Sequence, residues 1–215
     1  MKSKNINLNN DIPIFPLSNF IVFPKSTVPL NIFEPRYLQM VNDCMSSDRI
    51  IGIVQPRKTG ELNKPDLYDI GCACKITSFN ETEDGRYIIL IEGVSRFLIR
   101  KEKKTDKLYR TFEVDFHKFD YDLNDLEEKK ENIDLNYILK ELKQLFKSKG
   151  YSIDWKNLKN QSSYEIINSL SMASPFTIEE KQTLLEASDM FSRKKIFEDI
   201  LKMYTVTSFT NRTIQ

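Results

Sequence analysis

Apolar residues in the first part of the chain fall in short runs that prolines separate. Between Ile12 and Tyr37 the sequence reads IPIFPLSNFIVFPKSTVPLNIFEPRY, with apolar runs at Ile12–Leu17, Phe20–Phe23 and Val28–Phe33. Because proline fixes φ near about −65° and has no N–H to donate, the five prolines of this stretch exclude one long helix. The pattern predicts three short strands joined by bends and curling into a barrel.

The hydrophobic period changes after Glu34-Pro35. The next apolar residues follow the i, i+3, i+4, i+7, i+8 spacing of an amphipathic helix, at Tyr37, Met40, Val41, Cys44 and Met45. Proline suits the first helical position, where its missing N–H is not needed. The opening stretch is therefore predicted to end in a short helix over residues 36–47.

Further strand patterns follow up to about residue 119. They lie at Ile50–Gln55, Leu67–Phe79, Arg86–Glu92, Val94–Arg100 and Phe112–Phe116. Asp84-Gly85 predicts a hairpin turn, because glycine accepts a positive φ freely. Gly93 is expected to break the run that begins at Arg86, and Pro56–Pro65 is expected to be a polar loop.

From residue 120 the pattern becomes helical. Gly150 follows one apolar stripe as a suitable C-cap, and Thr177 with Glu180 forms a capping-box sequence before another. The sequence predicts an α+β fold with a β-rich subdomain at 11–119 and a helical bundle at 120–204. The ends, 1–10 and 205–215, are expected to be flexible.

Charge and composition exclude several classes of protein. The 32 basic and 31 acidic residues give a net charge of +1, without the bias of a nucleic-acid binder. No apolar run approaches the length of a membrane span, and the polar first ten residues do not resemble a signal peptide. Three cysteines without a secretory signal fit a reducing compartment. We therefore expect a cytoplasmic protein.

Residues that could carry chemistry are few. His117 is the single histidine, and it falls on the polar side of an alternating strand pattern. Cys72-x-Cys74 lacks the C-x-x-C spacing of redox and zinc sites, so we interpret both cysteines as buried apolar residues. The phosphate-binding sequence G-x-x-x-x-G-K-[ST] does not occur. We predict no catalytic residues, no metal and no cofactor.

The remaining candidates are recognition residues. Phe33, Glu34, Arg36 and Tyr37 combine aromatic area with charge at the predicted strand-to-helix corner, as a peptide-binding surface would. A purely structural interpretation stays open, with Glu34 and Arg36 paired locally and the two aromatic side chains in the core. Glu92 and Arg96 flank Gly93 in the sequence EGVSRF and allow the same two interpretations.

Five stretches, in order, resemble the substrate-binding (N-terminal) domain of the ATP-dependent Lon proteases. They are the PIFPL…FIVFP…PLNIFEPRY opening, IGIVQPR at Ile51–Arg57, LYDIGCACKI at Leu67–Ile76, DGRYIILIEGVSRFLI at Asp84–Ile99 and KQTLLEASDMFSRKKIFEDILK at Lys181–Lys202. FEPRY in particular resembles small free-standing bacterial relatives of that domain. The resemblance spans nearly the whole chain and does not include the Lon ATPase and peptidase modules.

This resemblance implies a PUA-like β pseudo-barrel followed by a helical bundle. It also implies a non-catalytic module that binds exposed apolar or unfolded polypeptide segments or a specific protein partner, with an adaptor role for a protease and the oligomeric state left open. RNA binding is the alternative, because PUA-like barrels also occur in RNA-modification proteins, but the even charge disfavours it. An enzyme is the third hypothesis, and no nucleophile–base pair supports it.

Overall fold

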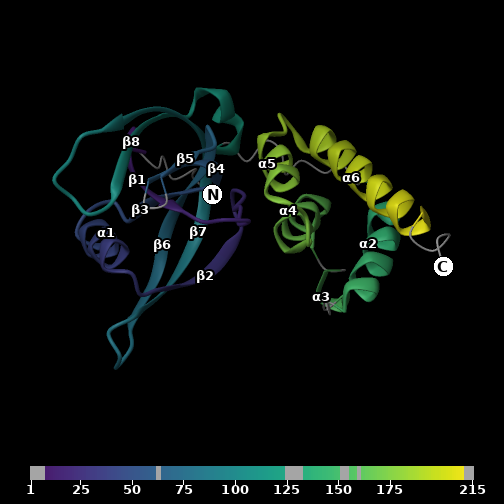
Figure 1. The fold of residues 1–215 in the computed structure, drawn as a ribbon, viewed down its shortest axis with the longest axis horizontal. Coiled ribbons are helices and arrows are strands. Elements are labelled where there is room, and N and C mark those ends of the chain that lie inside the picture. Colours follow the sequence, from purple (N-terminus) through teal and green to yellow (C-terminus); the bar gives the residue numbers. More distant parts are fainter. Residues whose placement is uncertain (1–7, 62–63, 124–132, 151–154, 159–160, 211–215) are drawn as a thin grey trace. The chain divides into compact units, whose positions relative to one another are not determined.

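The computed structural model describes the chain in five ranges, 8–61, 64–123, 133–150, 155–158 and 161–210. The chain divides into two compact units, residues 1–127 and 128–215. The first unit contains the strands and the second is helical (Figure 1). This order of strands before helices confirms the predicted α+β fold class.

The described strands of the first unit form a six-stranded sheet and a separate two-stranded hairpin. In the larger sheet, β6 pairs along one edge of β7. Along the other edge, β2 pairs with residues 87–92 of β7 and β8 pairs with residues 98–103. Because β8 continues through β1 and β3 back to β6, the sheet closes into a barrel with β2 added beside it. The strands of this sheet are β1 Asp11–Pro16, β2 Thr27–Ile32, β3 Ile50–Val54, β6 Ile70–Glu81, β7 Tyr87–Lys103 and β8 Arg110–Asp115.

The opening stretch contains two strands rather than the three predicted. β1 and β2 form as expected, and α1 (Pro35–Met45) begins with its proline in the first turn. The middle apolar run, Phe20–Phe23, is irregular, although Phe23 is fully buried. Asn19 and Lys25, with φ of 56° and 65°, turn the chain on either side of this run. The run therefore fills the core without joining the ladder.

β7 continues through Gly93 as one strand, contrary to the sequence-based expectation, although its pairing with β6 shifts register there. The close approach of another segment explains this glycine, since a Cβ built on it would lie 2.1 Å from the carbonyl oxygen of Phe23. Lys25 N–H donates to the Gly93 carbonyl at 2.7 Å, and Gly93 N–H donates to the Ser26 carbonyl at 2.9 Å. Gly93 thus lets the buried irregular segment lie against β7.

Two turn predictions have different outcomes. The Asp84-Gly85 hairpin is confirmed between β6 and β7, with Gly85 at a φ of 76°. The predicted polar loop is instead a hairpin of β4 (Pro56–Glu61) and β5 (Lys64–Leu67). Its mostly exposed polar side chains conceal the strand pattern, because Leu67 at the end of β5 is the apolar side chain of the hairpin that packs against a core cluster.

Two apolar clusters stabilise the barrel unit, and β3 contributes to both. Ile51 and Ile53 pack into the cluster that also contains Met40 and Val41 of α1. Ile50 and Val54 point the opposite way, into a second cluster of barrel residues. A strand buried on both faces reads as a continuous apolar run, which is why the sequence at Ile50–Val54 shows no alternation.

All three cysteines are buried. Burial raises the pKa of Cys44 to about 12 and also raises the pKa of Cys74. Because the thiolate is the reactive form, we predict that iodoacetamide at mildly alkaline pH leaves all three thiols of the folded protein unmodified. Mass spectrometry before and after guanidinium unfolding checks this. Rapid labelling of the native protein would contradict the buried placement, whereas three adducts are expected after unfolding.

The first unit extends past residue 119, where the sequence pattern changes. The short 3-10 segment η1 (His117–Leu123) carries Asp122, whose carboxylate binds Arg96 of β7. Residues 120–123 therefore stay with the barrel. The helical character expected from residue 120 begins, within the described residues, at α2.

Some residues of the two ends lie in the described ranges and make contacts with the rest of the chain. The carbonyl of Asn10 accepts a hydrogen bond from Val114 N–H at 2.7 Å, and Leu8 packs against the second apolar cluster. The last helix continues to Thr210, and Thr205 Oγ1 donates to Glu141 Oε2 at 3.2 Å. Residues 1–7 and 211–215 lie outside the described ranges.

The helical unit uses the predicted caps. Gly150 ends α2 in the left-handed conformation, and Thr177 with Glu180 forms a capping box on α5. Ser162 and Glu165 form a second box on α4 that the sequence analysis did not identify. α6 packs against α2, α4 and α5. The helices are α2 Asn136–Lys149, α3 Trp155–Leu158, α4 Ser163–Ala173, α5 Ile178–Glu186 and α6 Met190–Thr210.

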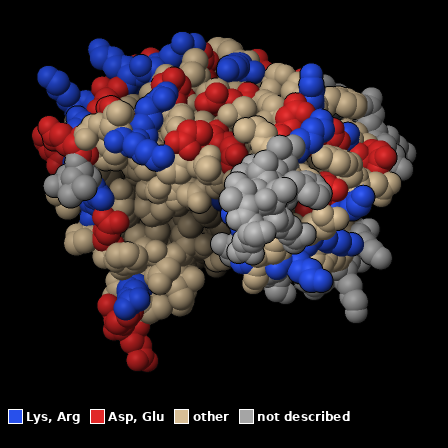
Figure 2. All heavy atoms as spheres, turned by 45° about the vertical axis from the view of Figure 1, so that its right-hand side comes forward, with Lys and Arg blue, Asp and Glu red and all other residues tan. Residues whose placement is uncertain are grey.

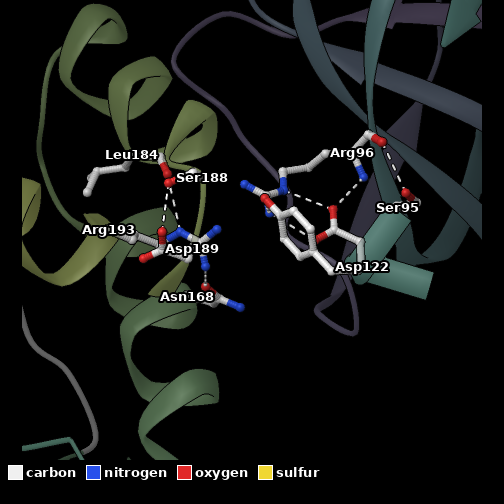
Figure 3. A network of polar contacts seen from close by, with 9 residues as sticks. Ser95, Arg96, Asp122, Asn168, Leu184, Ser188, Asp189 and Arg193 are labelled. Carbon is white, nitrogen blue, oxygen red and sulfur yellow. Dashed lines mark hydrogen bonds and ion pairs between the residues drawn. The ribbon is translucent and has the colours of Figure 1, made fainter. Parts of the chain in front are cut away.

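A buried arginine connects three of these helices. Arg193 of α6 is 1% exposed, and its guanidinium donates to Asn168 Oδ1 of α4 at 2.8 Å and to the Leu184 carbonyl of α5 at 3.2 Å (Figure 3). Hydrogen bonds of this kind compensate for the cost of burying a charge. Arg193 therefore has a structural role in the helical unit. None of the helices within the described ranges has the length and apolar character needed to cross a membrane.

Candidate functional site

The corner between β2 and α1 holds four of the six predicted recognition residues. Phe33, directly after β2, is 64% exposed. Arg36 donates from Nε and Nη2 to Glu34 Oε2, at 2.9 and 2.7 Å, so these two side chains form a local, partly exposed ion pair. Glu34 is the N-cap residue of α1, without a side-chain capping bond. Glu34 and Arg36 thus pair locally, and Phe33 is not in the core.

Tyr37 points the other way. It is 6% exposed, its ring centroid lies 4.3 Å from that of Phe15, and burial raises the pKa of its hydroxyl. The Arg36 guanidinium lies 4.7 Å from the Tyr37 ring centroid. Tyr37 is therefore a core residue, and it also lines a neighbouring cleft.

Phe33 and Glu92 belong to the same outward face of the β2–β7 ladder. Burial alternates along β2, with Thr27, Pro29 and Asn31 exposed, and Phe33 continues this face. Glu92 is exposed and lies opposite Thr27 at the far end of β2. At about 3.3 Å per residue, Phe33 and Glu92 lie about 20 Å apart along one surface. The structure therefore places both on one face without bringing them into contact.

An apolar strip lies on this face between the two residues. Pro29 is directly opposite Leu90, and Ile88, which is 46% exposed, is opposite Asn31. We call Pro29, Phe33, Ile88 and Leu90 the apolar strip. Figure 2 shows an uncharged area of the strand-rich unit beside the charged tip of the β6–β7 hairpin. Among the described strands β2 pairs with β7 alone, so the strip lies at an edge of the sheet.

A cleft of about 640 Å³ includes residues of the same corner. Its walls are the end of β1, the Glu34–Tyr37 corner, the β4–β5 hairpin and the connection between β7 and β8. Because Glu34 lines the cleft and follows Phe33 in the chain, the cleft and the apolar strip meet at this corner. Both features belong to the first unit.

Polar contacts to α1 fix the β7–β8 connection that forms one wall of the cleft. Lys107 Nζ and Tyr109 Oη both donate to Asp43 Oδ2, at 2.8 and 2.7 Å, and Leu108 N–H donates to Gln39 Oε1 at 2.9 Å. These hydrogen bonds lower the pKa of the Asp43 carboxyl and raise the pKa of Lys107. The backbone of the connection is therefore fixed to α1, whereas Leu108 is 64% exposed and its side chain is open to solvent.

Arg96 lies inside the fold and is separate from this surface. Its side chain is 1% exposed, and it binds Asp122 through Nε and Nη2, each at 2.9 Å (Figure 3). The backbone N–H of Arg96 also donates to Asp122 Oδ2, and Nη2 donates to Tyr121 Oη at 2.9 Å. The guanidinium stacks over the Phe119 ring with 4.3 Å to the centroid. We therefore assign Arg96 a structural role, anchoring η1 to β7.

Sequence reasoning did not identify several residues of this surface. Pro29, Ile88 and Leu90 belong to apolar runs, and the alternation along β2 and β7 could have placed them on an outward face. Lys107 and Leu108 gave no comparable signal, because they acquire their role only when α1 and the β7–β8 connection come together. His117 is exposed. Within the described ranges, no group of three or more His, Cys, Asp or Glu side chains is arranged to hold a metal ion.

The fold, the apolar strip and the cleft together define a module with a surface suited to recognition. Comparison with known families identifies a module of this class. Residues 11–203 match the substrate-binding domain of ATP-dependent protease La (Lon). This match covers most of the 215 residues, so the chain belongs to the Lon substrate-binding domain family. The resemblance found in the sequence is thereby confirmed.

Individual relatives give the same result. The chain is 27% identical to a Lon protease from Syntrophus aciditrophicus over 199 residues, covering 89% of this chain and 25% of that protein. It is 30% identical to a Lon protease from Desulfosudis oleivorans over 103 residues, covering 46% of this chain and 12% of that protein. The chain thus spans at most about a quarter of these two relatives.

Solved structures share the fold at low sequence identity. A crystal structure of a Lon N-terminal domain protein from Xanthomonas campestris aligns with a TM-score of 0.60 and 20% identity, covering 89% of this chain and 97% of that one. The N-terminal domain of a Mycobacterium avium complex Lon protease aligns with a TM-score of 0.59 and 16% identity, covering 89% and 98%. These alignments establish the fold.

Proposed function

We propose that this protein is a non-catalytic module that binds exposed apolar or unfolded polypeptide segments on the apolar strip and at the adjoining corner. The observation that carries the proposal is Phe33, an aromatic side chain 64% exposed on the same outward face as Pro29, Ile88 and Leu90 at a sheet edge. Exposed aromatic residues in an apolar surrounding are typical of binding surfaces. Membership in a family of substrate-binding domains supports the same function.

The energetics of this surface are sufficient for a weak and reversible complex. Covering the exposed part of Phe33, about 130 Å² of an aromatic surface of about 200 Å², stabilises a complex by about 3 kcal/mol. Ile88, with 46% of its surface exposed, adds to this. The cost of bringing two molecules together offsets part of the gain, so contacts from several side chains are needed. A strip of four apolar residues meets that requirement.

We expect the affinity for polypeptide to come from side-chain contacts more than from pairing of the bound segment as an added strand on the sheet. β2 is the edge strand, and an extended segment would have to pair with its free edge. Pro29 lies in the middle of β2 and has no N–H to donate. This proline weakens the edge as a template for an added strand. We therefore place the affinity in Phe33 and its apolar neighbours.

Replacing Phe33 with alanine should weaken binding of an unstructured, aromatic-rich polypeptide about tenfold or more, since the exposed ring is the largest apolar surface of the strip. Fluorescence anisotropy measures the affinity, and circular dichroism checks that the fold is retained. Phe191→Ala is the matched control, because Phe191 is 58% exposed on α6, outside the strip. An unchanged affinity for Phe33→Ala would exclude the strip as the site.

Salt dependence separates this function from RNA binding. Apolar recognition persists at high salt, whereas binding to a short single-stranded RNA falls steeply as counterions compete. The aromatic residues of the cleft, Tyr37 and Tyr109, are 6% and 4% exposed, which leaves little ring surface for bases to stack on. Binding to RNA alone, lost at high salt, would overturn the proposal.

We also place Glu34, Arg36 and Glu92 in the binding surface, as its polar boundary. Glu34 and Arg36 line the cleft, and Glu92 is exposed at the far end of the apolar face. The parts of the two relatives called Lon protease that align with this chain make up 12% and 25% of their length. Presenting bound polypeptide to a protease is thus the role we assign to this chain, in the cytoplasm. A specific protein partner held by the same strip is the narrower form of this role.

A further inference from the structure

The cleft beside the apolar strip has an unbalanced charge. Six cationic and two anionic side chains line it. Three more carboxylates, Asp11, Asp43 and Glu113, lie within 4 Å of lining lysines. Six cations and five carboxylates therefore meet at this site. The excess is small and local, which differs from the broad basic surfaces of polyanion binders.

The ion pairs identify where the excess lies. Arg36 pairs with Glu34. Glu102 forms ion pairs with two cations, Arg110 at 3.0 Å and Lys64 at 3.2 Å. Lys103 and Lys107 pair with the three outer carboxylates. Among the described residues, Lys104 is the lining cation that takes part in no ion pair, and it is exposed.

An apolar side chain accompanies this lysine. Leu108, 64% exposed, lines the same cleft and is held in place through its backbone N–H by Gln39 of α1. A ligand seated here would meet a cation and an apolar contact together. A cation beside apolar surface favours a carboxylate that is flanked by apolar groups, because the partial loss of solvent strengthens the ion pair.

We propose that the cleft recognises an acidic side chain of the bound polypeptide, next to the apolar residues that the strip takes. The proposal rests on the polypeptide binding proposed above and adds a preference: segments with Asp or Glu beside aromatic residues bind better than neutral or basic ones. Lys104 supplies the charge, and Leu108 contacts the neighbouring apolar group. The corner at Phe33 and Glu34 lets one continuous segment reach both places.

A polypeptide fits this charge distribution better than a nucleic acid. Binding of RNA gains from neutralising several phosphates, and an excess of one positive charge gives little of that gain. The cleft volume of about 640 Å³ is also that of a pocket for a few side chains. A single carboxylate matches both the size of the site and its charge.

Three labelled, unstructured peptides of equal length test this preference. They share the same aromatic residues and differ only in carrying Asp, Asn or Lys at the flanking positions. At low salt we expect affinities in the order Asp, Asn, Lys, with about three- to fivefold between neighbours, and a smaller spread at high salt. Lys104→Glu should reverse the order. Lys101→Glu is the matched control, with the same change in net charge on an exposed β7 lysine outside the cleft lining.

The possible outcomes separate the cleft preference from the proposed polypeptide binding. Equal affinities for the three peptides, with all three weakened by Phe33→Ala, would overturn the cleft preference and keep the proposed function. If none of the peptides binds, both proposals are wrong. An equal effect of Lys101→Glu and Lys104→Glu would assign the preference to overall charge and overturn the cleft. A short single-stranded RNA that binds more tightly than any peptide, and is released by Lys104→Glu, would identify the cleft as a nucleic-acid site instead.

Discussion

Replacing Asp122 with alanine should lower the free energy of unfolding by about 3–5 kcal/mol, one of the two largest effects we predict for a single side chain. Arg96 and Asp122 are both almost fully buried, and the Asp122 carboxylate accepts hydrogen bonds from the Arg96 side chain and backbone. Removing the carboxylate takes from the buried guanidinium the two hydrogen bonds that it donates to Asp122, while its hydrogen bond to Tyr121 stays. Urea denaturation followed by circular dichroism measures the change.

Asp120→Ala is the control for this prediction. Asp120 lies in the same 3-10 segment, but 65% of its side chain is exposed, so its loss should change stability by no more than about 0.5 kcal/mol. Equal effects of the two substitutions would show that the Arg96–Asp122 pair does not anchor η1 to the barrel.

Adding a single methyl group at position 93 should lower the free energy of unfolding nearly as much as the loss of the Asp122 carboxylate. In Gly93→Ala the new Cβ would lie 2.1 Å from the Phe23 carbonyl oxygen and 2.8 Å from its carbonyl carbon, and both atoms are backbone. Neither a rotamer change nor a small side-chain shift relieves this contact. We expect a loss of about 3 kcal/mol or more, with the buried Phe20–Phe23 segment displaced from β7. Urea denaturation gives the loss, and hydrogen exchange of that segment locates it.

Gly85→Ala provides the comparison. The same methyl group added at the β6–β7 turn meets nothing within 4 Å, and only the positive φ of 76° opposes it. Its expected cost is about 1–2 kcal/mol, without increased exchange at Phe20–Phe23. If Gly93→Ala is no more harmful than Gly85→Ala, close backbone approach is not the reason for glycine at position 93.

Local patterns in the sequence were enough to predict much of the fold. The stripe after Pro35, the Asp84-Gly85 hairpin and the Thr177 capping box depend on neighbouring residues, and each is confirmed. The Phe20–Phe23 run failed as a strand, because burial in an irregular segment and burial in a strand give the same apolar pattern. The left-handed backbone of Asn19 and Lys25, on either side of the run, makes it irregular, and the sequence around these two residues does not predict that conformation.

The candidate site was only partly predictable, for a similar reason. Phe33 and Tyr37 look alike in sequence, four residues apart, yet one continues the outward face of β2 and the other is on the buried side of α1. Arg96 could not be separated from a surface arginine until Asp122, 26 residues later, was seen to bind it. Long-range pairs of this kind depend on the tertiary fold.

Polypeptide binding to this face of the barrel is tested most directly by mapping the residues that a bound peptide perturbs. Amide resonances of the isotope-labelled full chain are followed by nuclear magnetic resonance while an unstructured, aromatic-rich peptide is added. We expect shifts that cluster at the residues around Pro29 and Phe33, at Ile88 and Leu90 of β7, and around Lys104 and Leu108. Shifts confined to the helical unit, or to strands remote from β2, would contradict the proposal that this face of the barrel recognises polypeptide.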